Sequence, residues 1–196
     1  MPATPLTRFE RAERNKDAIL DAAATVFAKR GFAGASIQEF LDLAGATKGG
    51  MYYHWQTKLD VATELLTRGA PRWQELLSGL AVGSRGLGAL SELWHGVAGA
   101  LEADVKLLAF VRIFDEIESG ASSPLTLLRD QMVTRLQQAL VDGEVDERIN
   151  MARTSTVLID AMCGVLFTPA PWGREAETAE RLDRLWSLLG IGVSAS

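Results

Sequence analysis

Cysteine and histidine are scarce in this sequence, and long apolar runs are missing. The single Cys163 excludes an intrachain disulfide, and together with His54 and His95 it does not complete a four-ligand metal site. No apolar run reaches the roughly 18 residues that a membrane-spanning helix needs. The polar start, MPATPLTRFERAERNK, lacks the apolar core of a secretion signal. We therefore expect a cytoplasmic protein without a cofactor, a metal or a membrane partner.

Proline is also rare, and the balance of charges differs between the two parts of the chain. Only 6 of 196 residues are proline, while leucine, alanine, glutamate and arginine dominate, a composition that favours helix. The net charge of −5 argues against a generally basic coat for nucleic acid. Residues 1–60 nevertheless carry 8 basic against 7 acidic residues, whereas the remainder carries 12 against 18. A polyanionic partner is therefore expected at the N-terminal end.

Apolar residues recur at helical spacing almost throughout, and no alternation is long enough for a sheet. Side chains that can cap a helix mark the predicted starts, and glycines mark the predicted ends. The predicted starts are Thr7 with Glu10, Ser36 with Glu39, Thr47, and Thr57 with Asp60, and the predicted ends are Gly31 and Gly45. Three short helices are therefore expected before residue 57.

The rest of the chain is predicted to form longer helices. Pro71 is expected to kink or break the fourth helix, because proline removes a donor and crowds the preceding turn. Five more helices are predicted at about 87–103, 105–118, 124–142, 147–168 and 175–190. The whole is an all-α fold of about nine helices. Since three short helices bury too little on their own, the first helix should pack on the fourth and join the two parts.

The tight turn at Gly45-Ala46 joins two short helices as a helix-turn-helix, which presents its second helix to the DNA major groove. The stretch TKGGMYYHWQTK around that helix is dense in groups able to donate to phosphates. These groups are Lys48, Tyr52, Tyr53, His54 and Lys58, with hydroxyls from Thr47 and Thr57. The adjacent Gly49 and Gly50 leave one face without side chains, so that backbone can approach DNA closely.

The segment FAKRGFAGASIQEFLDLAGATKGGMYYHWQTKLDVATELL resembles the DNA-binding domain of the TetR family of bacterial transcriptional repressors. The resemblance covers roughly residues 9–66, and the matching positions are Phe27, Gly31, Phe32, Ala44, Gly45, Thr47, Tyr52, His54 and Lys58. Met51 and Trp55 stand where Leu and Phe are usual and are conservative core replacements. Gly50 stands where many relatives carry a side chain able to touch a base. Specificity there is left to neighbours such as Thr47 and Lys48, or to DNA shape.

The resemblance implies a homodimeric repressor of a palindromic double-stranded DNA operator. It implies a helix-turn-helix domain over residues 1–57 and an effector-binding and dimerisation domain over residues 58–196. The residues that would contact phosphates or flank the groove are Lys48, Tyr52, Tyr53, His54 and Lys58. Those that would face bases are Thr47, Gly49 and Gly50. From the preceding helix, Ser36 and Gln38 would contact the DNA backbone.

Aromatic and methionine side chains of the larger part are mostly core, and a subset is expected to line a cavity for a small, mostly apolar effector. The candidates are Trp73, Leu93, Trp94, Val97, Phe110, Arg112, Phe114, Met132, Met162 and Phe167. Arg112, within the apolar segment LLAFVRIF, either pairs with Asp115 or Glu116 or donates to a ligand carbonyl.

The segments GLGALSELWHGVAGAL and AERLDRLWSLLGIG look similar to receptors for butyrolactone-type signals of actinomycetes. Those receptors tend to carry a ligand-facing Trp on the helix beginning near Pro124, and the corresponding segment here, LTLLRDQMVTRLQQAL, has none. A regulator that responds to a drug or a metabolite is therefore the alternative.

Two apolar stripes near the C-terminus would leave an exposed patch in a monomer, and an isologous four-helix interface would bury it. The residues concerned are Leu158, Ala161, Met162, Val165, Leu182, Leu185, Trp186 and Leu189.

Two functions from other classes compete with this interpretation. An all-helical enzyme is disfavoured, because the sequence has no recognisable pair of catalytic carboxylates, no nucleophile elbow and no metal cluster. An architectural DNA-binding protein without an effector remains, and it would differ from a receptor in having a fully packed interior.

Overall fold

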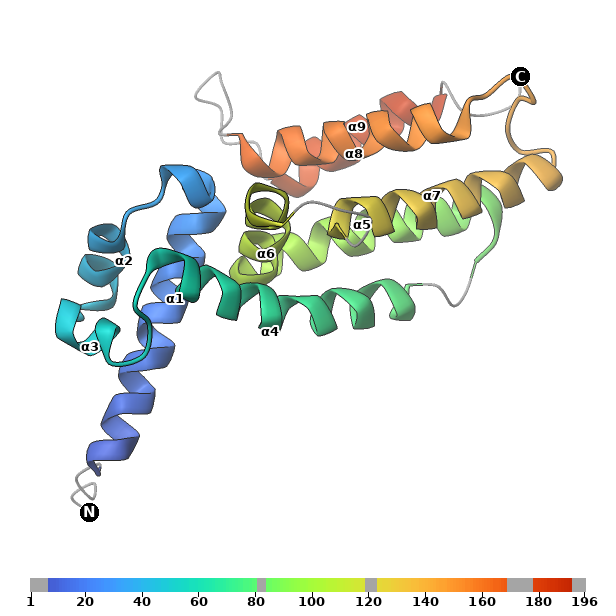
Figure 1. Cartoon of the computed structure of the whole chain (residues 1–196). Coiled ribbons are helices and arrows are strands. Elements are labelled where there is room, and N and C mark those ends of the chain that lie inside the picture. The colour runs from blue at the N-terminus through green and yellow to red at the C-terminus, as the bar shows by residue number, and fades with distance from the viewer. Residues whose placement is uncertain (1–6, 81–83, 119–122, 169–177, 192–196) are drawn as a thin grey trace, which may run out of the picture.

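The computed structural model describes residues 7–80, 84–118, 123–168 and 178–191, and this part of the chain is mostly helical. Its helices are α1 (Arg8–Gly34), α2 (Ile37–Ala44), α3 (Lys48–Tyr52), α4 (Lys58–Gly79), α5 (Gly86–Ala103), α6 (Val105–Ile117), α7 (Pro124–Val141), α8 (Met151–Phe167) and α9 (Thr178–Ile191). We call α1–α3 the head and α4–α9 the body (Figure 1). The predicted all-α fold is confirmed.

The predicted N-terminal caps of the first four helices are present. Reciprocal capping boxes join Thr7 with Glu10, Ser36 with Glu39 and Thr57 with Asp60. Thr47 Oγ1 accepts from the Gly50 N–H at 3.1 Å. At Gly31 φ is 72°, a left-handed value that glycine adopts readily, and it interrupts the regular helix before one further turn carries α1 to Gly34.

The prediction that Pro71 kinks or breaks the fourth helix is wrong, since α4 continues past Pro71 to Gly79. Proline costs a helix interior about 3 kcal/mol, partly through the hydrogen bond that it removes. Here Pro71 and Thr67, whose carbonyl loses that bond, both lie on the exposed side, where water can satisfy it. Buried residues on both sides, Leu66 and Trp73 among them, hold the helix against the body.

The eighth helix begins at Met151 rather than near residue 147. Asp146 Oδ1 accepts from the backbone N–H of Arg148 at 2.8 Å, and its carboxylate binds the Arg148 guanidinium as well. This local turn competes with the helix, and Asn150 then caps α8 by accepting from the Arg153 N–H. The predicted ninth helix began at 175, and residues 175–177 lie outside the described part.

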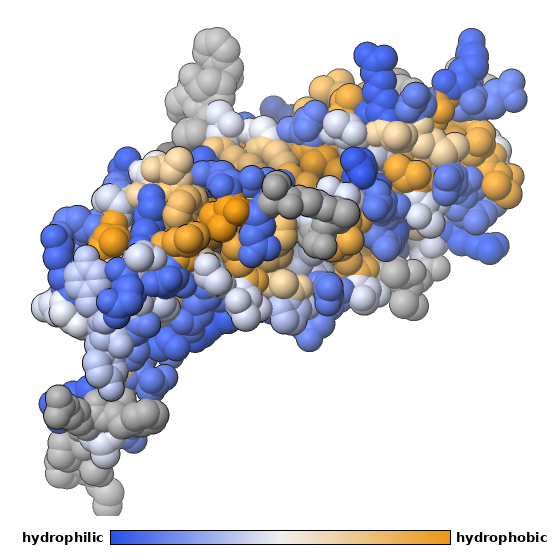
Figure 2. Space-filling model, in the orientation of Figure 1, coloured by the Kyte–Doolittle hydropathy of each residue, from blue (hydrophilic) through white to orange (hydrophobic). Residues whose placement is uncertain are grey.

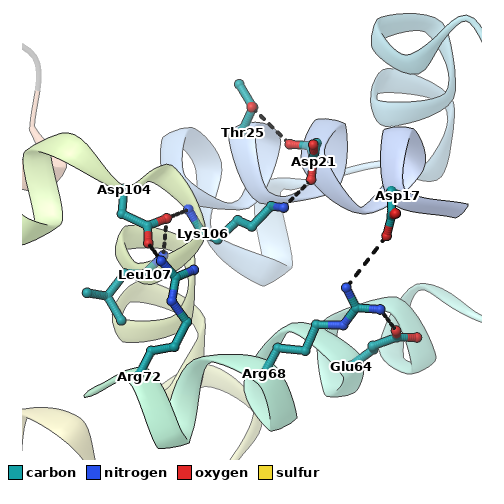
Figure 3. A network of polar contacts seen from close by, with 9 residues as sticks. All are labelled: Asp17, Asp21, Thr25, Glu64, Arg68, Arg72, Asp104, Lys106 and Leu107. Carbon is teal, nitrogen blue, oxygen red and sulfur yellow. Dashed lines mark hydrogen bonds and ion pairs between the residues drawn. The ribbon is translucent and has the colours of Figure 1, made fainter. Parts of the chain in front are cut away.

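The body contacts α1 mainly through α6, which crosses its C-terminal half, and the predicted packing of the fourth helix on the first is also present. α4 packs on α1 less extensively. Figure 3 shows Asp21 of α1 bound by Lys106 of α6, and Asp17 bound by Arg68 of α4. The head is therefore fastened to the body by α6 together with α4.

One continuous apolar core extends from the head into the body. Phe27, Phe40 and Met51 are fully buried in the head, and Trp73 and Phe110 continue the core between α4 and α6. No helix in the described ranges is long and apolar enough to cross a membrane.

Candidate nucleic-acid interface

The geometry of the α2–α3 pair is set by the turn between them. Gly45 adopts φ 61°, and its N–H bonds back to the Asp42 carbonyl at 3.3 Å, while the Ala46 N–H bonds the Leu41 carbonyl at 3.0 Å. These bonds close α2 and turn the chain tightly into α3. Because α3 has only five residues, its position depends on the buried Met51 that anchors it to the core.

Trp55 locks the end of α3 onto α4 and α1, which is the core role predicted for it. Its ring is buried, its Nε1–H donates to Glu64 Oε2 at 2.8 Å, and Lys16 of α1 pairs with the same carboxylate at 3.0 Å. Burial alone would raise the pKa of Glu64, but hydrogen bonds from Lys16, Trp55 and Arg68 hold it below its ordinary value. The carboxylate thus stays ionised and links α4 to α1 and to the segment that follows α3.

The outer surface of α3 carries donors and exposed aromatic rings. Tyr53 is 78% exposed and meets the half-buried His54 ring edge to face, with centroids 4.9 Å apart. Tyr52, Lys48 and Gly49 are also exposed. Large aromatic side chains left in water beside a lysine are typical of a surface that contacts a partner.

Lys58, predicted to contact a phosphate or flank the groove, already has two partners within the protein. Its Nζ donates to the carbonyl of Phe32 at 2.6 Å and to that of Ala35 at 2.8 Å, and it lies 4.4 Å from the centre of the Phe32 ring. Two of its three N–H groups therefore satisfy carbonyls at the end of α1. The sequence could not reveal this bond, because it joins residues 23 and 26 positions apart.

Ser36 and Gln38 of α2 are exposed, and both already have intramolecular partners. Ser36 caps its own helix, and Gln38 Nε2 donates to Asp42 Oδ1 at 2.7 Å. A contact of either side chain with DNA would have to replace or share these bonds.

The two glycines of α3 differ from each other. A Cβ on Gly49 would have open space around it, with Thr47 Oγ1 the nearest atom at 4.0 Å. A Cβ on Gly50 would lie only 2.6 Å from Nδ2 of Asn15 on α1. Gly49 fits the predicted role of a bare surface for DNA, whereas Gly50 makes room for a side chain of α1. The sequence analysis missed Asn15.

The body residues predicted to bind an effector are mostly interior, as an internal site requires. Leu93, Trp94, Val97 and Met132 are fully buried, and Trp73, Phe110, Phe114 and Met162 nearly so. The indole N–H groups of Trp73 and Trp94 are buried and find no acceptor among the described residues.

Arg112 does not pair with Asp115 or Glu116, the first of the two contacts predicted for it. Its guanidinium donates to the carbonyl of Ala28 in α1 at 2.7 Å and to that of Phe167 in α8 at 3.3 Å, and it lies over the Phe167 ring. It therefore links the body to the end of α1, because those carbonyls, and not the nearby acids, face it.

A pocket of about 380 Å³ opens where α6, α7 and α8 meet. Its lining residues are Asp115, Ser123, Leu125, Thr126, Arg129, Thr156, Ile159 and Asp160. None of them was predicted to line a pocket, because the sequence search followed apolar residues and six of these eight residues are polar.

The dimer residues predicted from the two apolar stripes are largely internal. Leu158, Met162, Val165 and Leu182 are buried within the protomer, because those faces of α8 and α9 pack on each other and on α5 and α7. Ala161, Leu185 and Trp186 are half-buried, and the Leu189 side chain lies outside the described part. Among the described residues of these helices, the large apolar side chains that stay exposed are Val157, at 48%, and Leu188, at 69%.

Comparisons with known proteins agree with this geometry. The model of the family described as bacterial regulatory proteins, tetR family, matches residues 19–65. The transcriptional regulator UidR of Escherichia coli (strain K12) is 24% identical over 177 residues, covering 87% of this chain and 90% of UidR.

Solved structures match over nearly the whole chain. A gamma-butyrolactone receptor (ArpA-like protein) has a TM-score of 0.72 and 27% identity, over 94% of this chain and 90% of that chain. CprB from S. coelicolor A3(2), a TetR family protein, has a TM-score of 0.73 and 29% identity, over 94% and 91%. CprB has also been solved in complex with its biological operator sequence.

The matched residues 19–65 run from the middle of α1 into α4 and contain the helix-turn-helix described above. These relatives are transcriptional regulators rather than enzymes, as the sequence predicted. The chain belongs to the tetR family of bacterial regulatory proteins.

Proposed function

We propose that the protein is a homodimeric repressor that binds a palindromic operator and is released from it by a small, mostly apolar effector. The DNA-binding unit comprises residues 1–57 and the effector-binding and dimerisation unit residues 58–196. The family and the fold of the neighbouring receptors support this proposal. The observation that supports an effector site in the body is the pair of buried indole N–H groups that have no hydrogen-bond acceptor among the described residues.

On the DNA side, α3 enters the major groove of each half-site. Tyr53 and Lys48 are exposed and bind phosphates, with Tyr52 and His54 beside them. Gly49 allows the backbone to approach, and the N-terminal end of α3 with Thr47 faces the bases. A two-fold dimer then reads two half-sites about one helical turn of DNA apart, or a multiple of it.

On the effector side, the body interior offers donors without acceptors. A buried donor left unpaired costs about 1–3 kcal/mol, so each orphan needs an explanation. Trp73 Nε1 and Trp94 Nε1 are two such donors, surrounded by apolar side chains. A ligand with carbonyl oxygens on an apolar frame, such as a butyrolactone-type signal, would supply acceptors for such donors, and two neighbouring structures are receptors of that kind.

Effector binding reaches the head through α6. Trp73 lies against Phe110 of α6, with ring centroids 6.5 Å apart. The same helix carries Arg112 and Glu116, which bind Ala28 and Ala33 near the end of α1. A ligand that separates Trp73 from Phe110 would move α6 and with it the head, and so favour a spacing that no longer fits the operator.

The homodimer forms through the outer faces of α8 and α9. Val157, Ala161 and Gly164 follow each other at helical spacing, and a Cβ at Gly164 would meet nothing within 4 Å. Leu188 of α9 adds an exposed apolar side chain. Hydrophobic surface on the visible face gathers mostly over the body rather than over α2 and α3 (Figure 2). A second copy would bury the apolar groups of this outer face.

The experiment is a screen of lactones, furans and drugs for release of selected operator DNA, read by fluorescence anisotropy. Trp73→Phe and Trp94→Phe keep an aromatic ring but remove the donor. They should weaken release by the active compound about tenfold, the loss of one buried hydrogen bond, and leave DNA affinity without it unchanged. If both variants release DNA as the wild type does, the two indole N–H groups do not bind the effector.

The polar pocket at α6, α7 and α8 supports one alternative, a more polar drug or metabolite as effector. Asp160→Asn tests it in the same assay, with Asp142→Asn at the far end of α7 as the matched control. If Asp160→Asn reduces release while both indole variants behave as wild type, the effector binds in the polar pocket.

A further inference from the structure

Asn15 of α1 lies against α3 at the point where Gly50 has no side chain. A Cβ on Gly50 would be 2.6 Å from Asn15 Nδ2 and 3.4 Å from Thr47 Oγ1. The Asn15 carboxamide therefore occupies the space that a side chain at position 50 would use. It also lies beside the N-terminal end of α3, where Thr47 caps the helix.

The polar side chains near Asn15 already have partners within the protein, whereas the Asn15 carboxamide has none among the described residues. Lys16 pairs with Glu64 at 3.0 Å, and Thr47 Oγ1 is bound by the Gly50 N–H at 3.1 Å. None of the hydrogen bonds among the described residues uses the half-buried Asn15 carboxamide. Its two N–H donors and its carbonyl acceptor are therefore left for a partner outside the fold.

The surroundings of Asn15 suit a residue that reads a base. Arg11 precedes it by one turn on the same face of α1, and Arg11 and Lys48 are both exposed. Such cations can bind phosphates and fix the position of the protein, which leaves a carboxamide near them to contact a base edge. A carboxamide pairs in bidentate fashion with N6 and N7 of adenine in the major groove.

We propose that Asn15 takes the place of the missing side chain at position 50 and reads an adenine in each half-site. This inference rests on the proposed insertion of α3 into the major groove. It assigns a base-reading role to a residue of the first helix, outside the helix-turn-helix itself. Gly50 then has a defined purpose, which is to let that carboxamide reach the groove.

The test is in-vitro selection from a random duplex library with the full-length protein, Asn15→Ala and the control Glu13→Ala, an exposed position on the same helix. The wild type and the control should enrich a palindrome with adenine at one symmetric pair of positions. Asn15→Ala should enrich the same palindrome with that preference reduced about tenfold, the discrimination of one bidentate pair.

The outcomes separate this inference from the proposed function. An unchanged base preference in Asn15→Ala would overturn the inference, as would a uniform loss of affinity with a smaller salt dependence, which marks a phosphate contact. Failure of the wild-type protein to enrich any palindrome would instead overturn the proposed operator binding.

Gly50→Ala provides an independent check that leaves Asn15 itself intact. The added methyl group must displace the carboxamide, so this variant should lose the same adenine preference as Asn15→Ala. Gly79→Ala, whose Cβ meets nothing within 4 Å, is the control for adding a methyl group to a helix. Thermal melting of each variant confirms folding, and a Gly50→Ala profile identical to wild type would contradict the inference.

Discussion

At the scale of single residues, two lysines of the DNA-binding region have different roles although they have the same side chain. Lys48 is exposed and forms no ion pair among the described residues, whereas Lys58 is held by the carbonyls of Phe32 and Ala35. A lysine bound inside the protein stabilises the fold, and a lysine in water is available to phosphate. The distinction follows from the partner of each ammonium group and not from its position in a motif.

This difference is testable with two identical substitutions. Lys48→Met should lower DNA affinity for all sequences and reduce the slope of log affinity against log salt by about 1, with unfolding unchanged. Lys58→Met should lower the free energy of unfolding by about 1–3 kcal/mol, because carbonyls lose a charged donor. The measurements are salt titrations of binding and urea unfolding. Equal effects of the two variants on stability would contradict the assignment.

At the scale of elements, the end of α1 and α6 form one joint. Gly31 has φ 72°, and the Glu116 carboxylate of α6 lies where a side chain at position 31 would be. That carboxylate also accepts from the Ala33 N–H at 2.9 Å. The glycine is therefore required twice, once for its backbone conformation and once for the space that α6 occupies.

Gly31→Ala should consequently destabilise the protein by about 1–2 kcal/mol from the left-handed backbone alone, and by more because of the contact with Glu116. A double-mutant cycle with Glu116→Gln, measured by urea unfolding, should show a non-zero coupling energy. Gly34→Ala, with an ordinary φ and its nearest contact at 3.4 Å, is the control. An equal loss in Gly34→Ala would refute the requirement at position 31.

At the scale of the whole molecule, the proposed dimer depends on the outer face of α8 and α9. The apolar stripe that contains Leu158 and Met162 is buried in the core of the protomer. Val157 and Leu188 stay exposed, so they are the apolar side chains that a second copy would cover. Trp186 is half-buried, and its ring packs on that of Trp94 with the two centroids 5.7 Å apart. A charge at Trp186 would therefore disturb the fold as well as any interface.

Val157→Arg and Leu188→Arg should each convert the proposed dimer into a folded monomer, because a buried unpaired charge opposes association. Val141→Arg is the matched control, since Val141 is an apolar side chain of another helix, 80% exposed at the end of α7. Light scattering at several concentrations measures the mass. A persistent dimer in both variants would place the interface elsewhere.

Contacts between residues close together in the sequence could be predicted from it, and contacts between distant residues could not. The caps at Thr7, Ser36 and Thr57 act within one turn of helix, so spacing alone reveals them. The exposed donors of α3 could also be named from the motif. Arg112 and Lys58, in contrast, bind carbonyls 84 and 26 residues away, a choice that depends on which helices become neighbours.

The sequence by itself determined the helical architecture, the helix-turn-helix and its family, because capping, glycine turns and apolar periodicity act over a few residues. Only the tertiary structure decided which face of α8 is buried, that α6 rather than α4 is the main support of α1, and that Gly50 makes room for Asn15. These outcomes depend on how apolar faces compete to be buried, and that competition is settled between helices far apart in the chain.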